Sequence, residues 1–236
     1  MRVATFNVLA DAYTSYGDYS HVDPELMATG ARLGHIVRLV EELDIDVIGL
    51  QEVEAPLRDR FERDSKWQLF WTPKTHSKPD GCLTLVKKGI EVVGFESHAY
   101  TDNSSHVMQI FRIGKTAFAN THIKWAPNDS VSHAGVIQTT ELLARLGGPD
   151  DPAVIFADCN DRPGGPVRQL VRDAGFVNVT DTEPTAIVNQ QLVALDLLAS
   201  RGLDAARVAY DFDIAAIPNT ECASDHIPLV ATIEVV

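Results

Sequence analysis

Four short apolar runs in this chain begin or end at a polar side chain that can bind a cation or move a proton. Asn7 follows residues 3–6, Glu52 follows residues 47–51, Asp158 follows residues 153–157, and Asp225-His226 precede residues 227–233. A strand presents such a terminal side chain at the rim of a sheet. Because the clusters come from the whole length of the chain, the pattern predicts a fold that gathers distant strand ends into one site.

The rest of the chain alternates between strand-like and helix-like patterns. We expect strands over residues 2–9, 46–51, 67–71, 81–87, 90–95, 107–113, 115–122, 153–157, 193–199 and 226–235. Apolar residues at helical spacing and turn signals predict helices over residues 24–43, 57–66, 132–146 and 165–174. Strands that come singly and in hairpins, with helices between them, predict an α/β fold of two packed sheets flanked by helices. No linker-like stretch divides the chain, so residues 1–236 are expected to form one domain.

Composition excludes several classes of protein. The formal net charge of −13 argues against stable binding to duplex DNA, which needs a basic surface, and leaves room for a small phosphorylated substrate or a strand end. No apolar run approaches the ~20 residues of a membrane span, and no leader pattern is evident, so we expect a cytoplasmic protein without a membrane partner. Cys82, Cys159 and Cys222 are far apart and are expected to be buried thiols.

The carboxylates and amides at the strand ends suit a hard cation. Glu52 directly follows a buried run, where a carboxylate is costly unless a cation meets it. Asn7 is either a turn residue or a metal or phosphate contact. Asp158 and Asn160 flank Cys159, so in extended backbone both side chains point to one side; an Asx turn is the alternative. Oxygen ligands without a thiolate partner indicate Mg²⁺ or Mn²⁺.

Two histidines are candidates for proton transfer or for stabilising phosphate charge. His226 follows Asp225 directly. Asp196 lies inside an apolar run and needs a partner, which we expect to be His226, with a salt bridge to Arg201 as the alternative. His122 ends another strand, where a histidine is more often structural. No Gly-rich phosphate loop and no nucleophile motif is present, which favours hydrolysis by metal-activated water over a covalent intermediate.

Taken together, the motifs resemble those of the endonuclease/exonuclease/phosphatase superfamily. They are Thr5-Phe6-Asn7, Leu50-Gln51-Glu52, Asn120-Thr121-His122, Asp158-Cys159-Asn160, Asp196 and Ser224-Asp225-His226. The phrases at residues 7–13, 50–54, 78–82 and 120–127 are similar to the branch that holds the deadenylases, nocturnin, the Angel proteins and the 2′,5′-phosphodiesterases. The resemblance implies a four-layered, DNase I-like α/β sandwich, with two mixed β-sheets packed face to face and helices outside. It also implies Mg²⁺-dependent phosphoester hydrolysis.

The resemblance assigns roles residue by residue. Glu52 would hold the metal, with Asn7 and Asp225 nearby. Asp158 would orient the attacking water, Asn160 the phosphate, and Asp196 would fix His226. His122 and His226 would stabilise charge or transfer protons. The residues expected to contact substrate are His76, Lys78, Asn120 and Trp125.

The expected activity is that of a Mg²⁺-dependent hydrolase, with Mn²⁺ as a second possible cofactor, acting on RNA 3′ ends or oligonucleotides. It would be a 3′-exonuclease or would remove a terminal or cyclic phosphate, and would act as a monomer. The alternative is a phosphatase of a small metabolite, such as a nucleotide, a dinucleotide 2′-phosphate or an inositol phosphate. A catalytically silent binding module is a third hypothesis, which the intact set of motif residues disfavours. Leu197 and Cys159 replace aromatic residues that are usual in the family, which bears on substrate choice.

Overall fold

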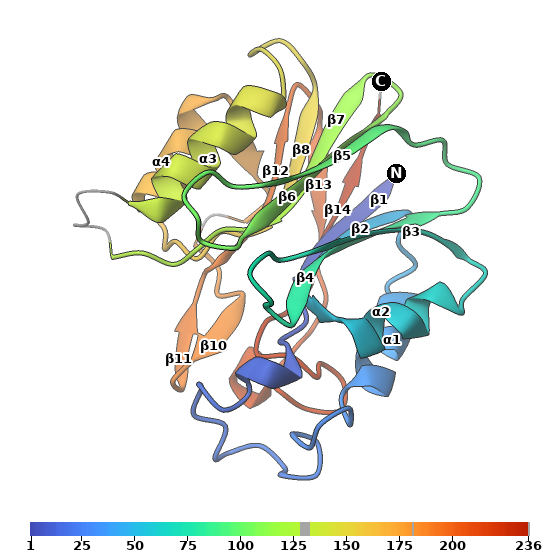
Figure 1. Cartoon of the computed structure of the whole chain (residues 1–236), viewed down its shortest axis with the longest axis vertical. Coiled ribbons are helices and arrows are strands. Elements are labelled where there is room, and N and C mark those ends of the chain that lie inside the picture. The colour runs from blue at the N-terminus through green and yellow to red at the C-terminus, as the bar shows by residue number, and fades with distance from the viewer. Residues whose placement is uncertain (128–132, 181, 236) are drawn as a thin grey trace.

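The computed structural model describes residues 1–127, 133–180 and 182–235. Two six-stranded sheets pack face to face, and each carries a pair of helices on its outer face (Figure 1). The four-layered α/β sandwich expected from the sequence is therefore confirmed. Within the described part of the chain, no helix has the length and apolar character needed to cross a bilayer.

The first sheet has the strand order β13-β14-β1-β2-β4-β3. Its strands are β1 (Arg2–Asn7), β2 (Val47–Glu54), β3 (Trp67–Pro73), β4 (Asp80–Lys87), β13 (Ala205–Val208) and β14 (Leu229–Ile233). The central strand β1 is parallel to β2 and antiparallel to β14. Helices α1 (Leu33–Glu42) and α2 (Ala55–Glu62) cover its outer face through Ile36, Leu39, Leu57 and Phe61.

The second sheet has the strand order β5-β6-β7-β8-β12-β9. Its strands are β5 (Val93–Ala99), β6 (Val107–Ile113), β7 (Thr116–His122), β8 (Ala153–Asp158), β9 (Val177–Asn178) and β12 (Asp196–Arg201). Helices α3 (Ala134–Arg145) and α4 (Pro166–Asp173) cover it through Leu142, Val167 and Val171. The hairpin of β10 (Ala186–Val188) and β11 (Gln191–Val193) stands apart, and two 3-10 turns complete the elements: η1 (Asp11–Tyr13) and η2 (Ile214–Ala216).

The structure departs from the expected elements where local conformation interrupts a pattern. The helix expected over residues 24–43 begins only at Leu33, because Gly30 has φ +79° and breaks the run. The strand expected over 193–199 is divided between β11 and β12. The short strands β9, β10 and β13 were not expected, because each is too short for an alternation of apolar and polar residues to be recognised. Residue 132, the expected start of α3, lies outside the described residues.

Strict alternation along the central strands separates the inner layer from the outer ones. Val3, Val47, Phe118, Val154 and Leu198 pack between the two sheets. Their neighbours in sequence, such as Ala4, Ile48 and Ala119, face the helices instead. A period of two is what a strand imposes on its side chains. The residues two positions further along each strand therefore also point between the sheets.

Towards one end of the strands, the inner layer is polar. Gln51 donates from Nε2 to Thr5 Oγ1 in its own sheet (3.0 Å) and to Asn120 Oδ1 in the other (2.8 Å). Asn120 donates from Nδ2 to Gln109 Oε1 (3.0 Å) and to Thr84 Oγ1 (3.2 Å). These amides satisfy one another across the two sheets and so fix how the sheets are placed on each other.

Gly49 is required at the point where the sheets come closest. A Cβ added there would lie 2.7 Å from Phe156 Cβ and 2.9 Å from Asn120 Cγ. We expect Gly49→Ala to lower the free energy of unfolding by about 1–3 kcal/mol through overpacking. Gly34→Ala is the matched control, because a Cβ on that exposed position of α1 meets nothing within 4 Å. It should stabilise the protein by about 0.5–1 kcal/mol. The free energies of unfolding of the two variants, measured in urea, test both predictions. Equal values for the two variants would contradict them.

Candidate active site

The inner rows of both sheets end in polar side chains at the same edge. Asn7 ends β1, His122 ends β7 and Asp158 ends β8. Asp196 begins β12 directly opposite Asp158, because the two strands are antiparallel. His226 precedes β14, which runs antiparallel to β1. The predicted convergence of distant strand ends is what the sheet topology produces.

Glu52 reaches this edge through a β-bulge. Regular alternation after Gln51 would turn Glu52 towards α1 and α2. However, the pairing of β2 with β4 shifts by one residue between Leu50 and Val53, and Glu52 adopts φ +56°. A bulge of this kind re-aims a side chain. Glu52 accordingly accepts hydrogen bonds from Asn7 Nδ2 (3.2 Å) and from the backbone N–H of Ala10 (3.0 Å).

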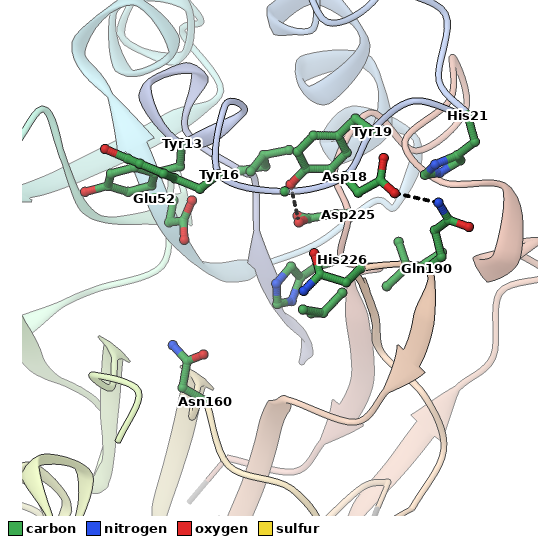
Figure 2. A pocket seen from close by; sticks show the side chains of 15 residues that line it. Tyr13, Tyr16, Asp18, Tyr19, His21, Glu52, Asn160, Gln190, Asp225 and His226 are labelled. Carbon is green, nitrogen blue, oxygen red and sulfur yellow. Dashed lines mark hydrogen bonds between the residues drawn. The ribbon is translucent and has the colours of Figure 1, made fainter. Parts of the chain in front are cut away.

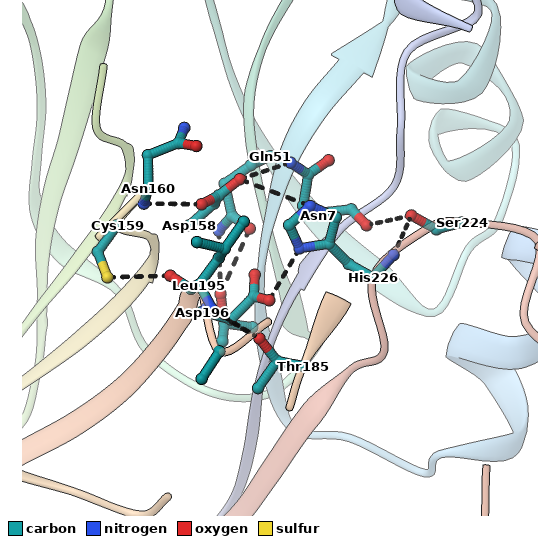
Figure 3. A network of polar contacts seen from close by, with 12 residues as sticks. Asn7, Gln51, Asp158, Cys159, Asn160, Thr185, Leu195, Asp196, Ser224 and His226 are labelled. Carbon is teal, nitrogen blue, oxygen red and sulfur yellow. Dashed lines mark hydrogen bonds and ion pairs between the residues drawn. The ribbon is translucent and has the colours of Figure 1, made fainter. Parts of the chain in front are cut away.

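Asp158 is the common neighbour of the site residues (Figure 3). It accepts hydrogen bonds from Asn7 Nδ2 (2.8 Å) and from the backbone N–H of Asn160 (2.9 Å). Its Oδ2 lies 3.6 Å from His122 Nε2 and 3.8 Å from His226 Nε2. Burial raises the pKa of Asp158 to about 6, although the neighbouring His226 acts in the opposite direction.

His226 is paired with Asp196, as the sequence predicted. Its Nδ1 lies 2.8 Å from Asp196 Oδ2. Burial opposes a charged imidazole, but Asp196, Asp158 and Asp225 together outweigh it and raise the pKa of His226 well above its usual value. The alternative partner, Arg201, donates to backbone carbonyls at the other end of β12. The surrounding carboxylates therefore favour the protonated imidazole of His226, whose Nε2 faces the site.

The pKa of His122 is shifted in the opposite direction. Burial and the positive charge of Lys74 lower the pKa of His122 well below its usual value. Its Nε2 lies 2.9 Å from Asn160 Nδ2, which also donates to the carbonyl of Ile123 (3.0 Å). Asn160 has φ +47°, so the extended backbone expected around Cys159 is wrong at this residue. The turn of the Asx alternative brings the amide of Asn160 onto His122.

The donor set fits a divalent cation. Ligand atoms of Glu52, His122 and Asp158 lie within 4.8 Å of one another. His122 Nδ1 is buried without a hydrogen-bond partner, 3.8 Å from Glu52 Oε1. Burial, together with the charge of Asp225, raises the pKa of Glu52 to about 7, while Lys74 acts in the opposite direction. A bound cation would compensate the buried carboxylates of Glu52 and Asp158.

The other two residues expected at the metal lie beside this trio. Asn7 directs its amide nitrogen at Glu52 and Asp158, while its Oδ1 accepts from the N–H of Leu9 (3.0 Å). Asp225 accepts a hydrogen bond from Tyr19 OH (2.7 Å) and lines the same cavity as Glu52 (Figure 2).

Three adjoining cavities open at the site, and Tyr16 and Asn160 line all of them. The first, of about 340 Å³, holds Glu52, Asp225 and His226 (Figure 2). The second, of about 810 Å³, is lined by Trp125, Arg162 and apolar residues of the β10–β11 hairpin. The third, of about 410 Å³, is lined by His122, His106 and three lysines: Lys74, Lys78 and Lys124. The site is therefore acidic at its centre, with a basic and an aromatic surface on its flanks.

The residues expected to contact substrate are distributed unequally. Lys78 and Trp125 line the flanking cavities. His76 is exposed and contacts Ser105 Oγ from Nδ1 (3.1 Å). The expectation for Asn120 is wrong, because its side chain is 0% exposed and all its contacts belong to the network between the sheets. Its position two residues before His122 places it one step deeper in the inner row.

Sequence reasoning missed several residues around the cavities. Lys74 is buried against Asp80 (Nζ to Oδ2 2.7 Å), which also accepts a hydrogen bond from Tyr13 OH (2.6 Å). Tyr16 and Tyr19 belong to the long segment after β1, and both line the first cavity. The only local signal was the density of tyrosines between residues 13 and 19, which has no regular period.

The chain is similar to known proteins in sequence and in fold. The sequence model described as "Endonuclease/Exonuclease/phosphatase family" matches residues 4–226. None of the curated proteins matches the chain. Among solved structures, ANGEL2, a 2′,3′-cyclic phosphatase crystallised with adenosine-2′,3′-vanadate, superposes with a TM-score of 0.80 at 19% identity, covering 98% of this chain and 94% of that chain.

Two further structures share the fold. The human Nocturnin catalytic domain with a bound sulfate has a TM-score of 0.74 at 19% identity, covering 100% of this chain and 93% of that one. The mannosyl-6-phosphatase Bt3783 of Bacteroides thetaiotaomicron has a TM-score of 0.71 at 13% identity, with complete coverage of both. At these identities the superpositions show the fold, and the match of the family model over nearly the whole chain shows the family. The chain belongs to the endonuclease/exonuclease/phosphatase family and is a phosphoesterase.

Proposed function

We propose that the protein is a Mg²⁺-dependent hydrolase that acts on RNA 3′ ends or oligonucleotides, by shortening them or by removing a terminal or cyclic phosphate. The observation that carries the proposal is the compact set of Glu52, His122 and Asp158 beside the His226–Asp196 pair. A phosphoester needs its oxygens neutralised, a water oriented and a donor near the developing charge. The residues of the site offer each of these in one place.

The residues of the site would each take a different part in the hydrolysis. Glu52 would hold the cation with Asn7 and Asp225 beside it, and the cation would neutralise charge on the phosphate oxygens. Asp158 is mostly ionised at neutral pH, since its pKa is about 6, and can orient a water and accept its proton. His226, held by Asp196, would donate from Nε2 to the phosphate. Asn160, which lines all three cavities, would contact the phosphate beside them.

The flanking cavities support a nucleotide or oligonucleotide as substrate. Lys74, Lys78 and Lys124 supply positive charge beside the acidic centre. Tyr16 and Trp125 are 81% and 63% exposed, and both line the junction of the flanking cavities. Exposed aromatic rings beside basic side chains suit the stacking of unpaired bases, whereas the net charge of −13 opposes binding along a duplex. ANGEL2, with its adenosine-2′,3′-vanadate, is a structural relative that makes a cyclic phosphate a probe worth testing.

A phosphatase of a small metabolite is the second candidate. The first cavity, of about 340 Å³, is the size of a site for one small molecule, and the similar fold of a mannosyl-6-phosphatase adds to this. RNA end-labelled and ending in 3′-hydroxyl, 3′-phosphate or 2′,3′-cyclic phosphate, incubated with Mg²⁺ or Mn²⁺, tests the first candidate. Phosphate release from a panel of phosphorylated metabolites tests the second. No change at any RNA end would reject the first.

Removal of an acid–base group tests the assigned roles. We expect Asp158→Ala or His226→Ala to lower kcat/KM by about 10²–10⁴, the usual contribution of such groups. His98→Ala is the control, because His98 lies on the edge strand β5 and pairs with Glu96. That variant should keep the parent kcat/KM. Asp158→Ala or His226→Ala within about tenfold of the parent would refute the roles.

The raised pKa of Glu52 predicts a pH-dependent stability. In the metal-free protein this pKa is about 7, above its ordinary value of 4.5, so the folded state binds the extra proton. The resulting stability is complete below about pH 4.5 and is lost as the pH rises through about 7. In EDTA, the free energy of unfolding of the parent should therefore fall by up to about 3 kcal/mol, relative to that of Glu52→Gln, as the pH rises from about 5 to 8.

A cation should reverse this trend, because it binds the ionised carboxylate. The gain in Tm on adding Mn²⁺ should increase from about pH 6 to 8 in the parent and be nearly absent in Glu52→Gln. If Glu52→Gln gains as much Tm from Mn²⁺ as the parent, Glu52 does not hold the metal.

The exposed aromatic rings should act on substrate binding alone. We expect Tyr16→Ala and Trp125→Ala each to raise KM for a nucleotide or oligonucleotide about 5- to 100-fold, from the ~1–3 kcal/mol of a stacked base. Tyr16→Phe and Trp125→Phe should restore most of the affinity. KM for a phosphorylated sugar without a base should stay at the parent value. A loss of kcat with both substrates would instead show that these rings support the site structurally.

A further inference from the structure

Arg32 directly precedes α1 and is buried, with 1% of its surface exposed. Its Nη1 donates to the carbonyl oxygens of Val8 (2.9 Å) and Ala223 (2.9 Å). Its Nη2 donates to the carbonyl of Leu9 and to Asp11 Oδ1 (2.6 Å). One guanidinium thus joins the segment after β1 to a segment more than two hundred residues later in the chain.

Both segments carry groups of the active site. Val8 and Leu9 follow Asn7, which donates to Glu52 and Asp158. Ala223 precedes the Ser224-Asp225-His226 turn, and Ser224 Oγ donates to the carbonyl of Asn7 (2.7 Å). The residue before Ser224, Ala223, is held by Arg32, which also binds the carbonyl of Val8, the residue after Asn7. The turn that carries His226 is therefore attached to the end of β1 at two neighbouring points.

The same guanidinium also controls the backbone that meets Glu52. Leu9 has φ +55°, a strained conformation for a leucine. Its carbonyl is held by Arg32, and its N–H donates to Asn7 Oδ1 (3.0 Å). With Leu9 held on both sides, the next N–H, that of Ala10, points at Glu52 Oε2 (3.0 Å). Arg32 thus sets the direction of a donor to the proposed metal ligand.

Asp11 fixes the guanidinium itself. One of its carboxylate oxygens accepts from Arg32, and the other accepts from the N–H of Gly30 (2.6 Å). A buried ion pair contributes little net stability compared with apolar packing of the same volume. Its value here is geometric, because an arginine fork can hold several carbonyls in a defined arrangement.

We propose that Arg32 is a positioning residue: it locks the turn at residues 8–10 against the turn at residues 223–226, so that Glu52, Asp225 and His226 keep their places around Asp158. The inference rests on the proposed function, because those residues need to act together. Displacement of a reacting group by about 1 Å can cost ~10² in rate even when substrate binding is preserved.

Arg201 provides a matched control in the same protein. It is 5% exposed and likewise donates to three carbonyls, those of Asp151 (3.0 Å), Ala174 (3.3 Å) and Leu146 (3.0 Å). It lies at the opposite end of β12 from Asp196, roughly 17 Å along the strand at ~3.4 Å per residue. Loss of its guanidinium removes the same kind of buried contact without touching the site.

The experiment compares Arg32→Lys with Arg201→Lys, using bis(p-nitrophenyl) phosphate and Mn²⁺. Lysine keeps the charge but cannot form the fork. We expect both variants to lose Tm. Only Arg32→Lys should lower kcat, by about 10²-fold, with KM within about threefold of the parent. Equal losses of kcat in the two variants, or an Arg32→Lys kcat within about threefold of the parent, would overturn the proposal.

Two further measurements keep the test decisive. If Arg32→Lys does not fold, Asp11→Asn releases the guanidinium while Arg32 remains, and should lower kcat about tenfold; an unchanged kcat would overturn the proposal. Mn²⁺ affinity, measured by electron paramagnetic resonance, should fall about tenfold in Arg32→Lys and be unchanged in Arg201→Lys, whether or not the probe is cleaved. A parent that binds Mn²⁺ but cleaves no phosphoester would refute the proposed function alone. A parent that does neither would refute both.

Discussion

The rest of the structure depends on the amide network between the two sheets. Gln51 and Asn120 donate across the interface, and Gln109 and Thr84 complete the set. A buried amide left without a partner costs more than the net gain of a single hydrogen bond, so the sheets can slide only by breaking several bonds at once. Because the network lies one step behind the edge, it fixes how the strand ends face each other. The site is assembled by this register.

The site concentrates buried acids that would repel one another without compensation. Asp158 and Glu52 have raised pKa values because of burial, and Asp196 contacts Nδ1 of His226 (2.8 Å). Burial opposes a charge on both histidines, but the carboxylates of Asp196, Asp158 and Asp225 raise the pKa of His226, whereas the charge of Lys74 lowers the pKa of His122 further. A cation in the position where Glu52, His122 and Asp158 meet would complete the balance. The buried carboxylates are unfavourable without a counter-charge. They therefore favour the binding of a cation and, with it, of a phosphate.

The surroundings of the centre come from segments outside the sheets. The segment after β1 brings Tyr16 and Tyr19, the β10–β11 hairpin forms another wall, and the loop before β4 brings Lys74 and Lys78. The β10–β11 hairpin is joined to the turn before β14 by a bond from the N–H of Ile187 to the carbonyl of Asp225, and the segment after β1 by side-chain contacts such as Tyr19 to Asp225. Chemistry is thus determined by the rigid strand ends, whereas the choice of substrate is determined by loops.

The sequence alone determined the longer strands, the edge at which they end and the pairing of Asp196 with His226, because a period of two and the cost of a buried charge are local properties. It did not determine the direction of Glu52, which a one-residue bulge turns towards the site, or that of Asn160, which depends on a left-handed φ. Nor did it separate His122 at the site from Asn120 in the network, two positions away on the same face. Tyr16, Lys74 and Arg32 reach the site through contacts between distant segments. Only tertiary packing decides such contacts, because the residues next to Tyr16, Lys74 and Arg32 in the sequence do not indicate which distant residues they contact.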